Sequence, residues 1–193
     1  MNVVIFASGE GSNAERIMEH FAPGTMARIT WVVSNREEAG VVHRARKFKK
    51  GIQFISTGTL HEMPNSFIDF LKCEKTDLIV LAGFLLKIPP ELVAAFPNRI
   101  LNLHPSLLPA YGGKGMYGMK VHRAVIDNME KKSGISVHYV NEEYDKGELI
   151  LQQSCDIENE DTAESLAQKI QQLEHIYYPK AIELAIQIGR AHV

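Results

Sequence analysis

Two side chains near the middle of the chain have the types and the spacing that carbonyl chemistry requires. Asn102 and His104 lie at the end of an apolar run, residues 100–103, which is expected to form a strand that Pro105 stops. Because side chains alternate along a strand, residues two apart project on the same side. An amide N–H donates to an oxyanion, and an imidazole exchanges protons near neutral pH. With a carboxylate from Asp145, the pair would stabilise an oxyanion and move a proton during attack on a carbonyl carbon.

A second segment suited to chemistry is the loop of residues 8–13, which follows the first apolar run and opens a helix. Exposed backbone amides and the helix dipole favour an anion there, so the loop is interpreted as a site for a phosphate monoester. Gly9, Gly11 and Ala14 also match the dinucleotide pattern G-x-G-x-x-A. A dinucleotide site of this type requires an acidic residue about 20 positions later, which binds a ribose hydroxyl. The sequence has Ser-Asn-Arg at 34–36, which disfavours NAD and leaves NADP, or a tight turn with nothing bound, as alternatives.

Apolar runs alternate with helical patterns, and these elements must position the candidate residues. Strands are expected at 3–7, 29–33, 52–55, 77–82, 100–103, 134–140 and 149–157. Helices are expected from 12 or 13 to 22, at 37–50, at 61–72, from Pro89 onward and at 162–188. Pro179 would introduce a kink in the last helix. This alternation predicts the α/β fold class, a Rossmann-like, mostly parallel sheet with helices on both faces. A short polar turn separates the last two strands, which are expected to form an antiparallel edge pair. Ligands of such sheets bind at the carboxyl ends of the strands.

The composition limits the class of protein. The 193 residues are 45% hydrophobic, which suits one buried core, so a single domain over residues 1–193 is expected. The formal net charge of -2 and the lack of a dense basic stripe argue against nucleic-acid binding. No apolar segment approaches the roughly 20 residues that span a bilayer, and the start has no basic signal region, so a cytoplasmic protein without membrane contact is expected. Cys73 and Cys155 form no CxxC pair, and no HExxH or acidic cluster is present, so no metal is expected.

Five segments, in this order, resemble the phosphoribosylglycinamide formyltransferases. They are residues 9–13, the run Leu-Ala-Gly-Phe at 81–84, residues 102–109, the segment 134–140 followed by Asp145, and Glu-His at 174–175 with Tyr-Pro at 178–179. The resemblance runs nearly end to end. The His-Pro-Ser-Leu-Leu-Pro segment at 104–109 would not identify this family by itself, because other enzymes that use formyltetrahydrofolate share it.

The resemblance implies the formyltransferase fold and a reaction in purine biosynthesis. The amine of glycinamide ribonucleotide would attack the formyl carbon of the cosubstrate 10-formyltetrahydrofolate. Asn102 would hold the formyl oxygen, and His104 would donate a proton and stabilise the oxyanion. Asp145 would raise the basicity of the imidazole and help to relay protons through water. The partners would be these small molecules, and the chain would be a monomer or a homodimer.

The resemblance also implies two sets of binding residues. The ribonucleotide would bind the amides of Gly11, Ser12 and Asn13 through its phosphate, and its glycinamide end would contact Gln171, Gln172, Leu173 and Glu174. The folate would bind Leu85, Leu86, Lys87 and Ile88, the catalytic Asn102, and the loop of Asn141, Glu142, Glu143, Tyr144 and Asp145. A helical Glu is commonly just solvated, so the role of Glu174 comes from the resemblance alone.

The chain departs from the family pattern in its basic residues. Leu86 stands where many members have a basic residue, and Lys87 follows one position later. The segment 61–67 has no arginine, although some members place one near the ligands. The glycine-rich loop 111–118 is longer than in some relatives, and it is expected to be either a mobile lid or a flexible solvated loop. If the loop is a lid, Lys114 would supply the positive charge that the family's basic residues provide near the ligands.

Several alternatives remain open at the level of sequence. A formyltetrahydrofolate deformylase commonly has an additional amino-terminal regulatory domain, whereas this chain starts directly on its first strand. A methionyl-tRNA formyltransferase needs a carboxyl-terminal RNA-binding domain. An NADP-binding reductase and a non-catalytic sensor of a phosphoribosyl ligand stay possible on the loop 8–13 alone. Asp145 itself lies in a turn, where aspartate is common for structural reasons.

Overall fold

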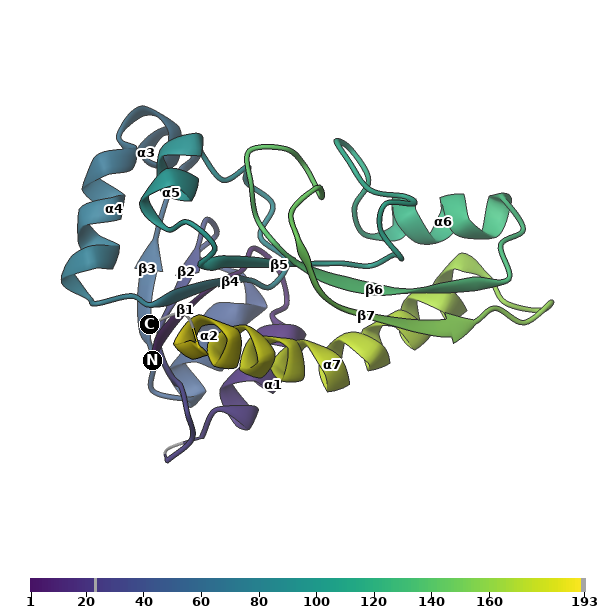
Figure 1. The fold of residues 1–193 in the computed structure, drawn as a ribbon, viewed down its shortest axis with the longest axis horizontal. Coiled ribbons are helices and arrows are strands. Elements are labelled where there is room, and N and C mark those ends of the chain that lie inside the picture. The colour runs from purple at the N-terminus through teal and green to yellow at the C-terminus, as the bar shows by residue number, and fades with distance from the viewer. Residues whose placement is uncertain (23, 192–193) are drawn as a thin grey trace. The chain divides into compact units, whose positions relative to one another are not determined.

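The computed structural model describes residues 1–22 and 24–191 of the 193-residue chain. These residues form two compact units, Met1–Asn102 and Leu103–Val193. Figure 1 colours the first unit from purple to teal and the second from teal to yellow. Among the described residues, no helix is both long and apolar enough to cross a bilayer.

The first unit is built on parallel strands in the order β3-β2-β1-β4-β5. Its elements are β1 (Asn2–Phe6), α1 (Ser12–His20), β2 (Arg28–Ser34), α2 (Gly40–Lys47), β3 (Gly51–Phe54), α3 (Thr57–Glu62), α4 (Pro64–Cys73), β4 (Leu78–Leu81), α5 (Pro90–Ala95) and β5 (Ile100–His104). All four residues of β4 are buried, as are the last four of β1. Continuous apolar runs of this kind form the central strands of a parallel sheet, which is covered on both faces.

The helices of the first unit form two groups. Helix α1 packs against α2, and α4 packs against both α3 and α5 (Figure 1). The carboxyl end of β1 leads into the loop of residues 7–11 and then into α1. This is the order of strand, loop and helix that the candidate anion site requires.

The second unit combines an antiparallel strand pair with two helices. Its elements are α6 (Met119–Asp127), β6 (Lys132–Tyr139), β7 (Leu149–Asp156) and α7 (Ala163–Ala191). Strands β6 and β7 pair antiparallel, with Ser136 opposite Gln152. Buried apolar residues from α6, β6 and α7 form one core, which consists of Val121, Val125, Ile135, Leu166 and Ile170. This core fixes the strand pair and therefore the turn between its strands.

All seven predicted strands are present, and none of their ends is shifted by more than two residues. The helix predictions were less accurate. Helix α6 was not predicted, and the helix expected at 61–72 is divided into α3 and α4, because Pro64 begins a new helix. The helix expected at 37–50 covers only Gly40–Lys47.

Helix α1 begins at Ser12, one of the two expected starts. Gly11 is the cap residue, in the left-handed conformation with φ 75°, and Ser12 is already the first helical residue. Pro179 lies inside α7, and the helix continues past it to Ala191.

Candidate active site

His104 is the last residue of β5 and is almost completely buried, with 4% of its surface exposed. Asn102 lies two residues earlier in the same strand, as the sequence predicts. Leu103 begins the second unit, so Asn102 ends the first unit and His104 belongs to the second. The contacts described next therefore lie within the second unit.

The structure brings Asp145 to His104. The carboxylate oxygen Oδ2 of Asp145 lies 3.4 Å from Nδ1 of His104. The same oxygen accepts a hydrogen bond of 2.9 Å from the backbone N–H of Gly113. Asp145 has a left-handed backbone with φ 55°, a conformation that aspartate tolerates better than most residues. The turn between β6 and β7 thus brings the Asp145 carboxylate to His104 at the end of β5, although the two residues lie far apart in the sequence.

The second ring nitrogen of His104 contacts the loop that follows the strand. Nε2 lies 2.8 Å from the carbonyl oxygen of Tyr111. Since a carbonyl oxygen only accepts hydrogen bonds, Nε2 carries a proton in this arrangement. Tyr111 has φ 57°, which is unusual for a bulky residue and orients the carbonyl toward the imidazole.

Burial and neighbouring charges act in opposite directions on the two groups. Burial lowers the pKa of His104 below its usual 6.5, and the positive charge of His138 adds to this, although Asp145 and the Tyr111 carbonyl oppose the change. Burial by itself would raise the pKa of Asp145. The hydrogen bonds from His138 and Gly113 and the charges of the two histidines outweigh burial and lower it. The site therefore pairs an ionised carboxylate with an imidazole that titrates below its ordinary range.

His138 was missed as a functional candidate. It lies in β6 and is 2% exposed, with Nε2 3.6 Å from the Oδ1 atom of Asp145. The alternation in 134–140 grouped it with Ser136 on a polar side, but both residues are buried. A polar strand face next to a turn that carries a candidate carboxylate was the signal that could have identified it.

A hydrogen-bond network around the buried Ser106 and Ser136 holds the loop that carries Tyr111. The Ser136 hydroxyl donates to the carbonyl of Ser106 at 2.6 Å and accepts from the N–H of Leu108 at 2.9 Å. The Gln152 amide donates to the carbonyl of Leu108 at 2.9 Å and to the Ser136 hydroxyl at 2.8 Å. The Ser106 hydroxyl in turn donates to the carbonyl of Ala110 at 2.6 Å. Strands β6 and β7 thereby fix the chain between His104 and Tyr111.

The predicted anion loop lies in the first unit and is tightly packed. The N–H of Val41 donates to the carbonyl of Gly9 at 3.1 Å, and Arg44 Nε donates to the carbonyl of Glu10 at 2.7 Å. A Cβ at position 11 would overlap Val41, so only glycine allows this approach of α2 to the loop. Arg44 also forms an ion pair with Glu15 of α1. The loop thus has a fixed backbone at the start of α1, where the amides of Ser12 and Asn13 lie.

The remaining predicted residues are distributed over both units. Residues 85–88 follow β4 in the first unit, where Leu85 is 58% exposed and Ile88 is buried. Residues 141–144 are exposed in the turn between β6 and β7, where Asn141 accepts a hydrogen bond from the N–H of Glu143. Residues 171–174 lie in α7, the first two exposed and Leu173 and Glu174 half-buried.

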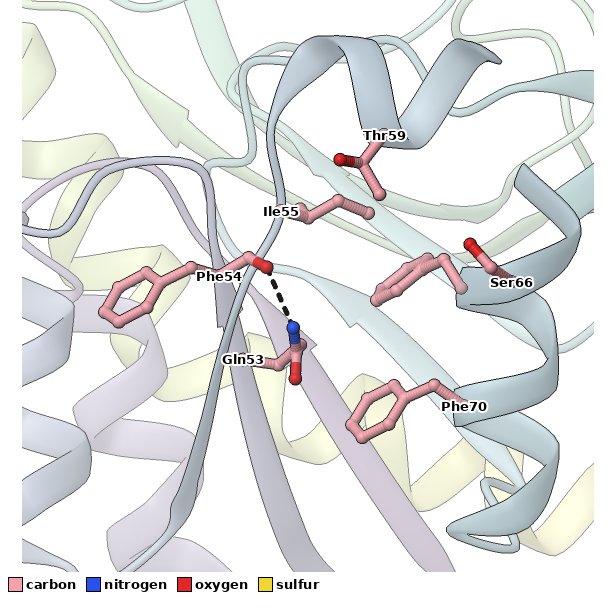
Figure 2. Close-up of a pocket in the computed structure, with 7 residues that line it drawn as sticks. Gln53, Phe54, Ile55, Thr59, Ser66 and Phe70 are labelled. Atoms are coloured by element: carbon pink, nitrogen blue, oxygen red, sulfur yellow. Dashed lines mark hydrogen bonds between the residues drawn. The ribbon is translucent and has the colours of Figure 1, made fainter. Parts of the chain in front are cut away.

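The first unit also contains a small pocket, lined by both polar and aromatic residues, that no prediction anticipated. Figure 2 shows the pocket, which has a volume of about 150 Å³, beside the end of β3 and the helices α3 and α4. It is lined by Gln53, Phe54, Ile55, Thr59, Ser66, Phe67 and Phe70. The rings of Phe67 and Phe70 stack at 6.0 Å between centroids. None of the predicted site residues lines this pocket. Within residues 1–22 and 24–191, no group of His, Cys, Asp and Glu side chains is arranged to hold a metal ion.

The parallel strands of the first unit and the antiparallel pair of the second define a Rossmann-like α/β protein, and the second unit holds a buried histidine–aspartate contact. A family model described as formyl transferase matches residues 1–182. The chain therefore belongs to the formyl transferase family, and the predicted resemblance and fold class are confirmed.

Named relatives agree with this assignment. The chain is 39% identical over 188 residues to the chloroplastic phosphoribosylglycinamide formyltransferase of Arabidopsis thaliana, covering 93% of this chain and 63% of the relative. It is 35% identical to the phosphoribosylglycinamide formyltransferase of Bacillus subtilis, covering 93% of this chain and 91% of the relative. The chain thus spans about three fifths of the plant relative and most of the bacterial one.

Solved structures show the same fold. Glycinamide ribonucleotide transformylase 1 from Symbiobacterium toebii superposes with a TM-score of 0.88 at 31% identity, covering 97% of this chain and 88% of that chain. Phosphoribosylglycinamide formyltransferase from Bacillus halodurans superposes with a TM-score of 0.87 at 33% identity, covering 99% of this chain and 97% of that chain.

Proposed function

We propose that the protein is a phosphoribosylglycinamide formyltransferase. It would transfer the formyl group of 10-formyltetrahydrofolate to the amine of glycinamide ribonucleotide, a step of purine biosynthesis. The observation that carries the proposal is the buried contact of His104 with Asp145, at 3.4 Å, in a chain of the formyl transferase family. The names of the relatives and of the solved structures support the choice of substrate.

The reaction needs an oxyanion donor and a group that moves a proton. In the proposed mechanism the Asn102 amide N–H donates to the formyl oxygen as the amine attacks, which stabilises the developing charge. His104 transfers protons through Nε2, the ring nitrogen opposite Asp145. The ionised Asp145 stabilises the imidazolium whenever His104 holds the additional proton. For Nε2 to reach a substrate, its hydrogen bond to Tyr111 must open.

The binding residues are proposed from the family resemblance. The amides at the start of α1, from Gly11, Ser12 and Asn13, suit the ribonucleotide phosphate, because the loop is rigid and the helix dipole favours an anion. Residues 171–174 would contact the glycinamide end. Residues 85–88 and 141–145, with Asn102, would contact the folate. Lys114 and Lys87 are the proposed sources of a cation near the ligands.

The cellular context is also proposed. We propose that residues 1–193 act as one formyltransferase domain, since a single family model matches residues 1–182. A cytoplasmic location remains a prediction, and a plant relative is named as chloroplastic. The chain is expected to act as a monomer or a homodimer on small molecules, without a metal or a nucleic acid.

The alternative functions gain no support from the comparisons. The relatives and structures reported above are named for transfer to glycinamide ribonucleotide, and none of these is named a deformylase or a reductase. In a deformylase, water would replace the ribonucleotide amine as the nucleophile, so the two reactions differ in their dependence on the second substrate.

One assay tests the proposal. The protein is mixed with glycinamide ribonucleotide and a 10-formyl folate analogue, and release of the deformylated folate is followed by absorbance. We expect turnover that depends strictly on the ribonucleotide. Turnover that continues at the same rate without the ribonucleotide would identify a deformylase instead. A change of nicotinamide fluorescence on addition of the protein to NADPH would support a reductase.

A further inference from the structure

The Asp145 carboxylate lies between two buried imidazoles. Its Oδ2 atom is 3.4 Å from Nδ1 of His104, and its Oδ1 atom is 3.6 Å from Nε2 of His138. The side chains of His104 and His138 are 5% and 3% exposed, and that of Asp145 is 11% exposed. Each oxygen of one carboxylate thus serves a different histidine. The formyl-transfer mechanism proposed above uses only one of these two contacts.

The second ring nitrogen of each histidine faces a backbone carbonyl. Nε2 of His104 lies 2.8 Å from the oxygen of Tyr111, and Nδ1 of His138 lies 2.7 Å from the oxygen of Tyr139. A neutral imidazole has one N–H group and can donate to one acceptor only. Each ring therefore satisfies both of its neighbours only when it is an imidazolium.

One carboxylate cannot balance two buried positive charges. Two imidazolium rings on the same carboxylate repel each other in a region where water screens little. This repulsion is among the causes that lower the pKa of His104, after burial. A positive charge on His138 therefore disfavours a second positive charge on His104.

Among the described residues, the groups other than Asp145 that act on the charge of His104 are neutral or positive. The loop after β5 contributes the Tyr111 carbonyl, and β6 contributes His138. Helix α6 contributes His122, whose pKa is lowered by burial and then by the charge of His104. Among the described residues, Nδ1 of His122 has no hydrogen-bond partner. Asp145 is thus the carboxylate that both His104 and His138 approach.

We propose that His138 is a positioning residue that holds the Asp145 carboxylate and competes with His104 for its charge, and thereby sets the pH at which His104 gains and loses its proton. The inference deepens the proposed function, because it assigns the control of His104 to a residue outside the Asn102, His104 and Asp145 set. A neutral residue at position 138 removes the positive charge that competes with His104 for Asp145. The proton affinity of His104 then rises.

The test is an NMR titration of the imidazole signals of the full chain without substrate. The His104 signals are assigned by their loss in His104→Asn. We expect the His104 titration midpoint to move up by about 1 pH unit in His138→Gln, because a competing positive charge is removed. His61→Gln, at an exposed histidine of the first unit, is the control and should leave the midpoint unchanged. His138→Asn is a second neutral variant in case His138→Gln does not fold, and it should move the midpoint in the same direction.

Activity gives an independent readout. The pH profile of kcat should shift upward in His138→Gln together with the NMR midpoint. An unchanged midpoint in a folded variant would overturn the inference, as would a uniform loss of kcat at every pH without a shift. A midpoint that moves in a protein without formyl-transfer activity would support the role of His138 and reject the proposed function, so the two are tested separately.

Discussion

The carbonyl oxygen of Tyr111 lies 2.8 Å from Nε2 of His104, so the loop after β5 accepts a hydrogen bond from the histidine that precedes it. Opposite this bond, Nδ1 faces the carboxylate of Asp145 at 3.4 Å. The imidazole is therefore held from both sides before any ligand binds. The contact with Asp145 keeps the ring oriented when the hydrogen bond to Tyr111 opens, as the proposed mechanism requires.

Replacing Asp145 with Asn should lower the pKa of His104 further. The carboxylate opposes the effect of burial on His104, and an amide has no charge with which to do so. We expect the His104 midpoint to move down in an NMR titration, opposite to the shift expected for His138→Gln. The value of kcat should fall by about 10²- to 10⁴-fold, the usual range for loss of acid–base catalysis.

The same variant tests the link between Asp145 and stability. The pKa of Asp145 is lowered in the folded protein, so its contribution to stability is present above pH 3.8 and is lost as the pH falls below that value. Asp145→Asn should therefore reduce Tm at pH 7 more than at pH 3. A midpoint of His104 that rises or stays constant in Asp145→Asn would contradict the charge pairing.

Asn102→Ala tests the oxyanion donor. The substitution removes the amide N–H that is proposed to bind the formyl oxygen. The value of kcat should fall by about 10²- to 10³-fold, as is typical for loss of one oxyanion donor. Steady-state kinetics with both substrates measures the effect, and thermal unfolding serves as the control for folding. Near-normal turnover would show that Asn102 does not stabilise the transition state.

The sequence predicted the elements that local patterns encode. The strand expected at 100–103 followed from three apolar residues, at 100, 101 and 103, shortly before Pro105. The turn with Asp145 followed from the polar residues between two β patterns. His138 and Ser136 were not recognised, because their burial depends on how the β6 and β7 pair packs within its unit. Period-2 alternation identifies a strand but cannot show that both of its faces are covered.

Helix α6 shows a second limit of sequence patterns. The glycines at 112, 113, 115 and 118 predicted a loop, and the nine-residue helix that follows them was not predicted. Its apolar face packs against Leu166 and Ile170 of α7, which lie far later in the chain. Tertiary packing therefore determines this helix more than local propensity does.

Ser136→Ala should weaken the loop that carries Tyr111. Ser136 is fully buried, and its removal leaves the N–H of Leu108 without its acceptor. An unsatisfied buried donor costs about 1–3 kcal/mol, which denaturant unfolding would measure. Ser154→Ala, at an exposed position of β7, is the matched control and should change stability by less than about 0.5 kcal/mol. Equal stability of the two variants would exclude the proposed role of the network.

Gly147→Ala should disturb the support of His138. A Cβ at position 147 would overlap the carbonyl oxygen of Tyr139, the group that accepts the hydrogen bond from His138. Backbone must move, so we expect a loss of about 1–3 kcal/mol in unfolding free energy and a lower kcat. Gly58→Ala in α3, whose nearest neighbours are 3.7 Å away, is the matched control. It should be neutral or stabilising by up to about 1 kcal/mol, since alanine suits a helix better than glycine does.

Asp161 should control the acid stability of the second unit. Its carboxylate accepts hydrogen bonds from Lys169 Nζ at 2.5 Å, the Ser165 hydroxyl at 2.7 Å and the N–H of Glu158 at 2.8 Å. The Lys169 hydrogen bond contributes most, and together these contacts lower the pKa of Asp161 to about 2.

Because the folded pKa lies below the usual 3.8, the stabilisation by Asp161 is fully present above pH 3.8 and is lost as the pH falls toward about 2. Asp161→Asn should therefore lower the unfolding free energy at pH 7 by on the order of 1 kcal/mol, after allowance for solvent screening. The difference from wild type should disappear near pH 2. Asp156→Asn removes a carboxylate that is 75% exposed and 3.9 Å from Lys132, and it should change stability little at any pH. A constant difference between Asp161→Asn and wild type from pH 7 to pH 2 would mean that these contacts stabilise the loop without depending on the charge of Asp161.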